Sequence, residues 1–303
     1  MYVKKWSQNE LDMISRDMSI EEVMGKTGRG YESVSRMVRR LKPRGNKEQV
    51  IPKVLLFDIE TAPLLVYTFG IFEQTIQPSQ VAEDKYILSW SAKWLMSPEI
   101  MHNRVTGRES VKRDDKRIVK SLWKLLDEAD IVIGHNSIKF DEKQMNAKFI
   151  EYDLKLPSPF QSIDTLKIVR NVASFTSNKL DFLLGKFKMA QKTPNEGLPL
   201  WIRCKHGDED ALKEMDKYCQ NDVRILEDLY LFLRPYAKAQ PNMSIYNEIE
   251  KEFCPICGSD KIKWGGYYYT SVNKFRSGRC KCGAIVRRKV SELSKEKRRL
   301  ILK

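Results

Sequence analysis

Two carboxylates stand at the end of an apolar stretch early in the central part of the chain. Asp58 and Glu60 close the run Val54–Thr61, which is rich in strand-forming residues. Side chains alternate between the two faces of a strand, so residues two apart point the same way. Carboxylate oxygens on one face are suitable ligands for a hard divalent cation such as Mg²⁺. Taken alone, the pair also fits solvated acidic residues in a turn after a strand.

A second acidic residue, Asp141, follows another apolar run. Ile131–Ile133 is predicted to be a strand, and the loop after it leads to Asn136, Phe140 and Asp141. Ligands of open α/β sheets bind beyond the carboxyl ends of the strands, so Asp141 is expected at the same sheet edge as Asp58 if the two strands are parallel. Alternatively, Asp141 merely stabilises the start of a helix through the helix dipole.

A third pair lies on a predicted helix near residues 208–233. Tyr218 and Asp222 are four residues apart, so a phenol and a carboxylate project from the same face about one turn apart. A surface Tyr and Asp on an amphipathic helix would have the same spacing. The pair gains meaning only from the other carboxylates.

The three motifs together are far more specific than any one of them. D-x-E closing an early strand, N-x-x-x-F-D after a later strand and Y-x-x-x-D in a late helix occur in this order. In this respect, residues 53–236 resemble the DEDD exonuclease superfamily, in the branch whose third motif carries Tyr. Segments around Asp164 and Asn178–Leu183 are similar to those of phage-encoded and polymerase-B-like exonucleases.

The resemblance implies a role for each residue of the motifs. Four carboxylates would hold two Mg²⁺ or Mn²⁺ ions, and Tyr218 would orient the attacking water. The metal-binding residues implied are Asp58, Glu60, Asp141 and Asp222. The residues expected to contact substrate in this domain are Thr61, Asn136 and Phe140. Asp164 and Asp181 are interpreted as structural or substrate-side residues outside the metal set.

The expected fold is α/β: a ribonuclease H-like, mixed five-stranded sheet with flanking helices. Strands are predicted at 54–61, 86–94, 100–105 and 131–133, and helices at 114–127, 141–152 and 208–233. Strands that come first and then alternate with helices are typical of a mixed sheet covered by helices.

Residues 1–45 are predicted to form a three-helix helix-turn-helix that binds DNA, followed by a linker at 46–52. Ser7 with Glu10 and Ser19 with Glu22 have the spacing of capping boxes, and a turn is expected at Gly25–Gly30. The segment is similar to small Myb and homeodomain-like modules. Its last helix carries three residues expected to contact DNA: Arg36, Arg39 and Arg40. A three-helix cap or a protein-interaction module remains an alternative.

Four of the six cysteines cluster near the end of the sequence, and we expect them to bind one structural Zn²⁺. They are Cys254, Cys257, Cys280 and Cys282. The spacing resembles a zinc ribbon over 251–291, after a linker at 237–250 and before a basic tail at 292–303, although the second pair is C-x-C where C-x-x-C is usual. Nearby aromatic residues are either the ribbon's own core or a surface that stacks bases.

The net charge of +14 is unevenly distributed. Residues 1–50 carry 11 Lys and Arg against 7 Asp and Glu, and residues 251–303 carry 15 against 4, so the remaining 200 residues are nearly neutral. Two basic ends around a neutral centre favour a nucleic-acid partner, because Lys and Arg gain affinity from phosphates. No stretch is apolar enough for a membrane helix. We therefore expect a soluble cytoplasmic protein, in the host cytoplasm if it is phage-encoded.

These observations predict a metal-dependent 3′→5′ exonuclease that releases nucleoside monophosphates from single-stranded DNA. The direction and the preference for DNA follow from the resemblance alone. One alternative is the same chemistry on RNA, and another is a non-catalytic DNA-binding regulator built on a nuclease-like scaffold. A separate replication or repair protein is a possible further partner.

Overall fold

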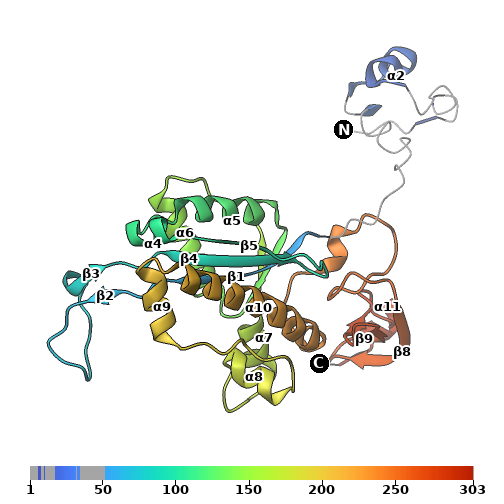
Figure 1. Cartoon of the computed structure of the whole chain (residues 1–303). Coiled ribbons are helices and arrows are strands. Elements are labelled where there is room, and N and C mark those ends of the chain that lie inside the picture. Colours follow the sequence, from blue (N-terminus) through green and yellow to red (C-terminus); the bar gives the residue numbers. More distant parts are fainter. Residues whose placement is uncertain (1–5, 8–9, 11–17, 32, 35–51, 303) are drawn as a thin grey trace. The chain divides into compact units, whose positions relative to one another are not determined.

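The structure is a computed structural model that describes residues 6–7, 10, 18–31, 33–34 and 52–302 (Figure 1). The chain divides into two compact units, Met1–Gln49 and Val50–Lys303. Among the described residues, no helix has the length and apolar character needed to cross a membrane.

In the N-terminal unit, helix α2 spans Ile20–Thr27. Both predicted capping boxes form: Glu10 and Ser7 exchange hydrogen bonds, and so do Glu22 and Ser19. The expected turn over Gly25–Gly30 begins too early, because α2 continues through Gly25 to Thr27 and is capped by Gly28, whose φ is 65°. The predicted DNA-contact residues Arg36, Arg39 and Arg40 lie outside the described residues, so the helix-turn-helix remains a prediction.

The larger unit contains the expected mixed five-stranded sheet, in the order β5-β4-β1-β6-β7. Strand β1 is antiparallel to β4 on one side and parallel to β6 on the other, and β4–β5 is antiparallel while β6–β7 is parallel. The strands are β1 Val54–Thr61, β4 Ile87–Trp94, β5 Met101–Arg104, β6 Ile131–Gly134 and β7 Gln161–Asp164. Because β1 and β6 are parallel, the ends of both point to the same sheet edge.

Helices cover both faces of this sheet (Figure 1). They are α4 Gly107–Lys112, α5 Lys116–Glu128, α6 Asp141–Glu151, α7 Thr165–Val172, α8 Leu180–Lys186, α9 Leu198–Lys205 and α10 Glu209–Leu233. Alternate residues of β1 enter two cores: Leu55 and Phe57 pack with α5 and α6, whereas Leu56 packs with α7, α8 and the second half of α10. The sheet is therefore covered by an apolar core on each face.

Long α10 packs across β4 and β1. Its apolar stripe places Val223, Leu226 and Leu229 in the second core, while Met215 and Tyr218 belong to the first. Beneath the helix, Ser89 and Ser91 of β4 are fully buried, and such small side chains allow a helix to approach a sheet closely. The helix thus carries its polar residues directly over the end of β1.

Smaller elements complete this unit. A two-stranded sheet joins β2 Leu65–Val66 to β3 Val81–Glu83, next to the short helix η1 Pro78–Gln80. Two further 3₁₀ helices, η2 Arg234–Tyr236 and η3 Met243–Tyr246, follow α10. In the segment predicted to be a linker, Met243 is buried in the core around α10, and its N–H bonds Pro255 O at 2.8 Å.

The last part of the chain forms a three-stranded antiparallel sheet, followed by the short helix α11 Lys295–Arg299. Its strands are β8 Ile262–Tyr269, β9 Lys274–Cys280 and β10 Ile285–Arg287. The small core consists of two cysteines, Cys254 and Cys280, with Ala284 and Val286. A core this small offers little hydrophobic stabilisation by itself.

Candidate metal centre

Three of the four predicted metal-binding carboxylates meet at the edge of the central sheet. Asp58 and Glu60 project from the end of β1, and Asp222 projects from α10, which lies across that strand. One carboxylate oxygen from each residue lies within 4.8 Å of the other two. Residues separated by about 160 positions in the sequence therefore form one acidic cluster.

The fourth carboxylate, Asp141, is held beside this cluster. It is the first residue of α6, is only 5% exposed, and its Oδ1 accepts a hydrogen bond from Ile59 N at 3.3 Å. That bond ties the start of α6 to the backbone between Asp58 and Glu60. Asp141 does not belong to the group whose oxygens lie within 4.8 Å of one another, so it lies next to the three-residue group.

Burial and mutual repulsion make these carboxyl groups harder to ionise. Burial, followed by the charges of Asp141 and Glu60, raises the pKa of Asp58 well above its usual range. Burial and Asp222 raise the pKa of Glu60 to about 8, and burial raises that of Asp141 to about 7. A bound cation would offset this repulsion by neutralising the carboxylates.

The donor set fits a hard divalent ion. Ligands of an octahedral Mg²⁺ lie about 2.1 Å from the ion, so two of them are separated by at most about 4.2 Å. The three carboxylates each place an oxygen within 4.8 Å of the other two, so small side-chain adjustments would bring them to one ion. In addition, Asp222 Oδ1 is buried and accepts no hydrogen bond within the described part of the chain. A buried carboxylate oxygen without a donor calls for a cation or water.

Two neighbours of the cluster were not predicted. Lys192, from the loop between α8 and α9, forms an ion pair with Asp222, and its Nζ also donates to Tyr218 Oη at 3.0 Å. Trp201 of α9 contacts the Tyr218 ring edge to face, with centroids 5.9 Å apart. Neither residue belongs to a spaced motif, so the sequence contained no signal for either one.

Tyr218 itself lies in the predicted position on α10, one turn before Asp222. Its side chain is 9% exposed, and burial together with Asp222 raises its pKa to about 12. The phenol is therefore protonated at neutral pH. It can donate a hydrogen bond but cannot serve as a base.

The loop that delivers Asp141 is fixed by residues outside the cluster. Asn136 has a φ of 67°, and its N–H donates to Asp164 Oδ1 at 2.9 Å. Asp164 also caps α7 by accepting from Leu166 N at 3.0 Å. His135 bonds Thr165 Oγ1 and Asn178 O. Asp164 thus lies outside the acidic cluster and organises the loop, as its structural interpretation proposed.

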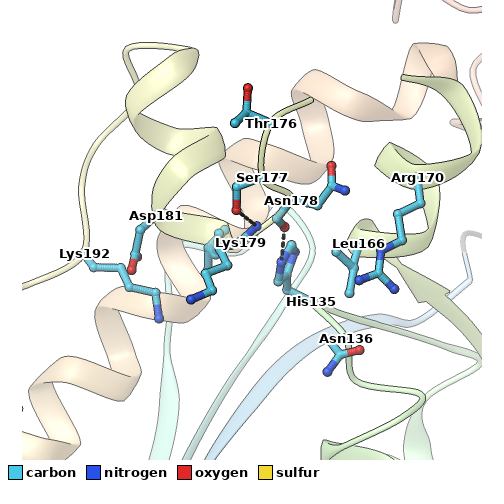
Figure 2. A pocket seen from close by; sticks show the side chains of 11 residues that line it. His135, Asn136, Leu166, Arg170, Thr176, Ser177, Asn178, Lys179, Asp181 and Lys192 are labelled. Carbon is cyan, nitrogen blue, oxygen red and sulfur yellow. Dashed lines mark hydrogen bonds between the residues drawn. The ribbon is translucent and has the colours of Figure 1, made fainter. Parts of the chain in front are cut away.

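Figure 2 shows a pocket of about 550 Å³ whose lining includes Lys192. Because Lys192 forms the ion pair with Asp222, the pocket lies next to the cluster. Asn136, one of the predicted substrate contacts, lines it together with Asp181 and Lys192. The other two predicted contacts in this domain remain accessible: Phe140 is 39% exposed, and Thr61 is half-buried at the end of β1. The pocket is also lined by two basic residues, Arg170 and Lys179, which suit a ligand that carries phosphate.

A second candidate metal site lies in the three-stranded sheet near the C-terminus. One sulfur atom from each of Cys254, Cys257, Cys280 and Cys282 lies within 4.8 Å of the other three. The sulfurs of Cys254 and Cys282 are 3.9 Å apart, and those of Cys257 and Cys280 are 3.6 Å apart. Tetrahedral Zn²⁺ with Zn–S bonds of about 2.3 Å requires sulfurs about 3.8 Å apart. The C-x-C pair therefore fits a four-cysteine zinc site as well as the C-x-x-C pair does.

Comparison with known proteins finds a match to part of the central domain. Residues 99–234 match the family model described as the RNase H superfamily, a range that includes Asp141, Tyr218 and Asp222 but begins after Glu60. No curated protein matches the chain. Among solved structures, the chain is similar to the family B DNA polymerase of the hyperthermophilic archaeon Pyrobaculum calidifontis, at 15% identity and a TM-score of 0.45. The similarity covers 72% of this chain and 32% of the polymerase.

The family match and the mixed sheet together establish the fold of this domain. It is an RNase H-like α/β domain, as expected, with helices on both faces of a five-stranded sheet. Nucleases of this superfamily use divalent metals, and the acidic cluster at the sheet edge is compatible with that chemistry.

Proposed function

We propose that this chain is a metal-dependent 3′→5′ exonuclease that hydrolyses phosphodiester bonds at the ends of single-stranded DNA. The single observation that carries the proposal is the convergence of Asp58, Glu60 and Asp222 within 4.8 Å at the edge of an RNase H-like sheet. A scaffold without catalytic function would gain nothing from three adjoining carboxyl groups with one lysine beside them, because buried like charges destabilise a fold.

The roles proposed for the carboxylates rest on the resemblance of the three motifs to Tyr-type DEDD exonucleases. Asp58, Glu60 and Asp222 would together hold the divalent ions, and Asp141, beside them, would help to hold these ions. When bound, such ions neutralise the phosphoryl oxygens, activate water and stabilise the leaving oxygen. Tyr218, protonated and next to Asp222, would orient the attacking water by a hydrogen bond.

Substrate contacts are proposed for residues around the cluster. The half-exposed ring of Phe140 offers a stacking face for a base, and Asn136 and Thr61 offer hydrogen-bonding groups. The 3′→5′ direction and the preference for DNA rest on the resemblance of the three motifs to Tyr-type DEDD exonucleases. The basic N-terminal segment and the zinc ribbon would retain the enzyme on nucleic acid through their positive charge.

The proposal is tested with 5′-labelled single-stranded DNA, duplex DNA and RNA, each incubated with Mg²⁺ or with EDTA. A ladder of shortened single-stranded DNA, formed only with Mg²⁺, is the expected result. Preferential shortening of RNA would overturn the DNA assignment, and the absence of products on every substrate would overturn the enzymatic one.

Matched variants locate the activity in the cluster. Asp58→Ala and Asp222→Ala should each abolish Mg²⁺-dependent release of nucleotides while DNA binding remains intact. Asp228→Ala is the control, because Asp228 lies on the same helix α10 but is exposed to solvent. Wild-type activity in either cluster variant would contradict the assignment.

A further inference from the structure

The hairpin formed by β8 and β9 carries three consecutive tyrosines that do not belong to the core of the zinc ribbon. Tyr267, Tyr268 and Tyr269 are 53%, 44% and 64% exposed. The side chains that pack around the cysteines are instead Ala284 and Val286, with Ile262 and Trp264 at their edge. The tyrosines therefore contribute little to the folding of this module, and their exposure requires another explanation.

Strand geometry divides these aromatic residues between two faces. Tyr267 and Tyr269 are two residues apart on β8, and their cross-strand partners on β9 are Arg276 and Lys274. We call these four residues the tyrosine face. Tyr268 lies on the opposite side, where it contacts Phe275. The tyrosine face thus presents two exposed rings and two cations together.

One cation of the tyrosine face, Lys274, lies against the tyrosine rings. Lys274 Nζ lies 3.7 Å from the centre of the Tyr267 ring and 6.0 Å from that of Tyr269. The ion pairs in this part of the chain join Lys251 to Asp260 and Arg288 to Glu252. Within the described residues, no carboxylate forms an ion pair with Lys274 or Arg276, so both remain available to an anionic ligand.

We propose that the tyrosine face binds single-stranded nucleic acid, with bases stacked on Tyr267 and Tyr269 and phosphates contacted by Lys274 and Arg276. Exposed aromatic rings interleaved with cations are a general solution for binding unpaired bases of any sequence. Residues 251–303 carry 15 Lys and Arg against 4 Asp and Glu, which favours a polyanion over an apolar protein partner. The inference concerns binding only and does not depend on the proposed nuclease activity.

The spacing of the two rings favours a single strand over a duplex. Their centroids lie 6.4 Å apart, with the ring planes inclined at 51°. Successive bases in one strand of B-DNA rise by about 3.4 Å. Neighbouring bases can therefore reach both rings only if the strand is extended and its bases are unstacked, which a duplex prevents.

The test measures the binding of a short fluorescein-labelled oligo(dT) to the full chain by fluorescence anisotropy. It uses the Asp58→Ala background without chelator, so that the probe is not cleaved and zinc stays in place. Tyr267→Ala/Tyr269→Ala should raise the Kd about tenfold or more, because each stacked base contributes substantially to affinity. Tyr267→Phe/Tyr269→Phe keeps both rings and should bind as the parent protein does.

Three controls make the result decisive. Tyr236→Ala removes a tyrosine that is 60% exposed but lies outside the hairpin, and it should leave the Kd unchanged. Lys274→Glu should weaken binding and flatten its dependence on salt, whereas the tyrosine double variant should keep the slope. Zinc content and the midpoint of thermal unfolding confirm that each variant is folded.

Duplex DNA of the same length is the comparison probe. The tyrosine double variant should bind this duplex with the same Kd as the parent protein does. The proposal is overturned if that variant binds oligo(dT) as tightly as the parent protein, or if duplex binding falls to the same extent. Oligo(U) in place of oligo(dT) should show the same loss, because stacking does not distinguish DNA from RNA.

Discussion

Lys192 forms an ion pair with Asp222 and occupies the side of that carboxylate that faces Tyr218. The lysine is three-quarters buried, and the attraction of Asp222 raises its pKa even though burial alone would lower it. Its ammonium therefore partly neutralises the acidic cluster. Lys192 bonds Oδ2 of Asp222 and leaves Oδ1 free, so a divalent ion that used both oxygens would compete with this ammonium. Lys192 also lines the pocket that contains Asn136.

Replacing Lys192 should separate metal binding from catalysis. Lys192→Met removes the competitor for Asp222, so the affinity of the protein for Mn²⁺ without nucleic acid should rise by about fivefold, corresponding to about 1 kcal/mol for one lost ion pair. The kcat for DNA cleavage should nevertheless fall, because we expect the Lys192 ammonium to contact substrate phosphate from its place in the lining of the pocket. Isothermal titration with Mn²⁺ and single-turnover cleavage measure the two effects.

The control for this prediction is Lys186→Met, which removes an exposed lysine of α8 whose ammonium lies over Phe175. It should change neither Mn²⁺ affinity nor kcat. Weaker Mn²⁺ binding in Lys192→Met would show that the ammonium supports the site and does not compete with the metal.

Tyr218→Phe should lower kcat by about 10- to 100-fold while KM stays nearly unchanged, because the hydroxyl is proposed to position water and not to bind substrate. Packing against Trp201 is kept by the phenylalanine ring, so the thermal stability should change little. The pKa of Tyr218 is raised to about 12, so the phenol remains protonated below about pH 10. The pH dependence of the residual activity should therefore match that of the wild type between pH 6 and 10. A lost ionisation in this range would identify Tyr218 as a base.

The order of motifs predicted the core of the candidate site, since strand alternation alone orients Asp58 and Glu60 and helix spacing alone aligns Tyr218 with Asp222. The strands β1, β4 and β6 were predictable because they are apolar runs of strand-forming residues, and β5 was predicted in spite of its polar sequence. The fifth strand, β7 Gln161–Asp164, is short and polar and was not predicted, so the number of five strands followed only from the resemblance of the motifs. Lys192 and Trp201 could not be predicted. They reach the cluster through the path of the segment between α8 and α10, which depends on tertiary packing and not on local periodicity.

In the N-terminal unit and in the ribbon, local sequence patterns predicted some features and could not predict others. Capping boxes are local, so both were predicted correctly, whereas the end of α2 was misplaced because Gly25 is tolerated inside a helix. In the ribbon, the sequence allowed the aromatic residues to be either core or surface. Tyr267 and Tyr269 are exposed, so these two aromatic residues belong to the surface. Their place on one face became visible only from the pairing of β8 with β9.

Gly134→Ala should disrupt the loop that delivers Asp141. A Cβ at position 134 would lie 2.3 Å from Ser137 Cβ and 2.6 Å from Ser137 Oγ, far closer than atoms can approach. We expect a loss of about 1–3 kcal/mol in the free energy of unfolding and a fall in kcat as Asp141 shifts. Urea denaturation and cleavage assays measure both.

Ser137→Gly provides the rescue for this variant. It removes both close atoms and leaves Ser137 Cα at 3.6 Å, an ordinary contact, so Gly134→Ala/Ser137→Gly should recover most of the stability. Gly185→Ala is the matched control in α8, where the nearest atom is 3.9 Å away. Failure of the double variant to recover would mean that Gly134 acts through another contact.

Removing zinc should unfold the ribbon and reduce the stability of the central domain. The four-cysteine core is too small to fold alone, so its stability is expected to come from the metal. The ribbon also rests on the end of α10: Gly283 lies against Pro235, and Gln240 bonds Ile256 O at 3.0 Å. Cys282→Ser should therefore abolish binding of one Zn²⁺ and lower the Tm by about 2–4 °C for each kcal/mol of lost contact.

Cys204→Ala distinguishes this effect from the general loss of a cysteine, because Cys204 is buried in the central domain and is not part of the cluster. It should retain one Zn²⁺ per chain by atomic absorption, while Cys282→Ser retains none. Oligo(dT) affinity should fall only in Cys282→Ser, because the tyrosine face is built on strands that the proposed zinc site would hold together. A Cys282→Ser protein that still binds one Zn²⁺ with unchanged affinity would rule out four-cysteine ligation and assign the site to the three remaining thiols.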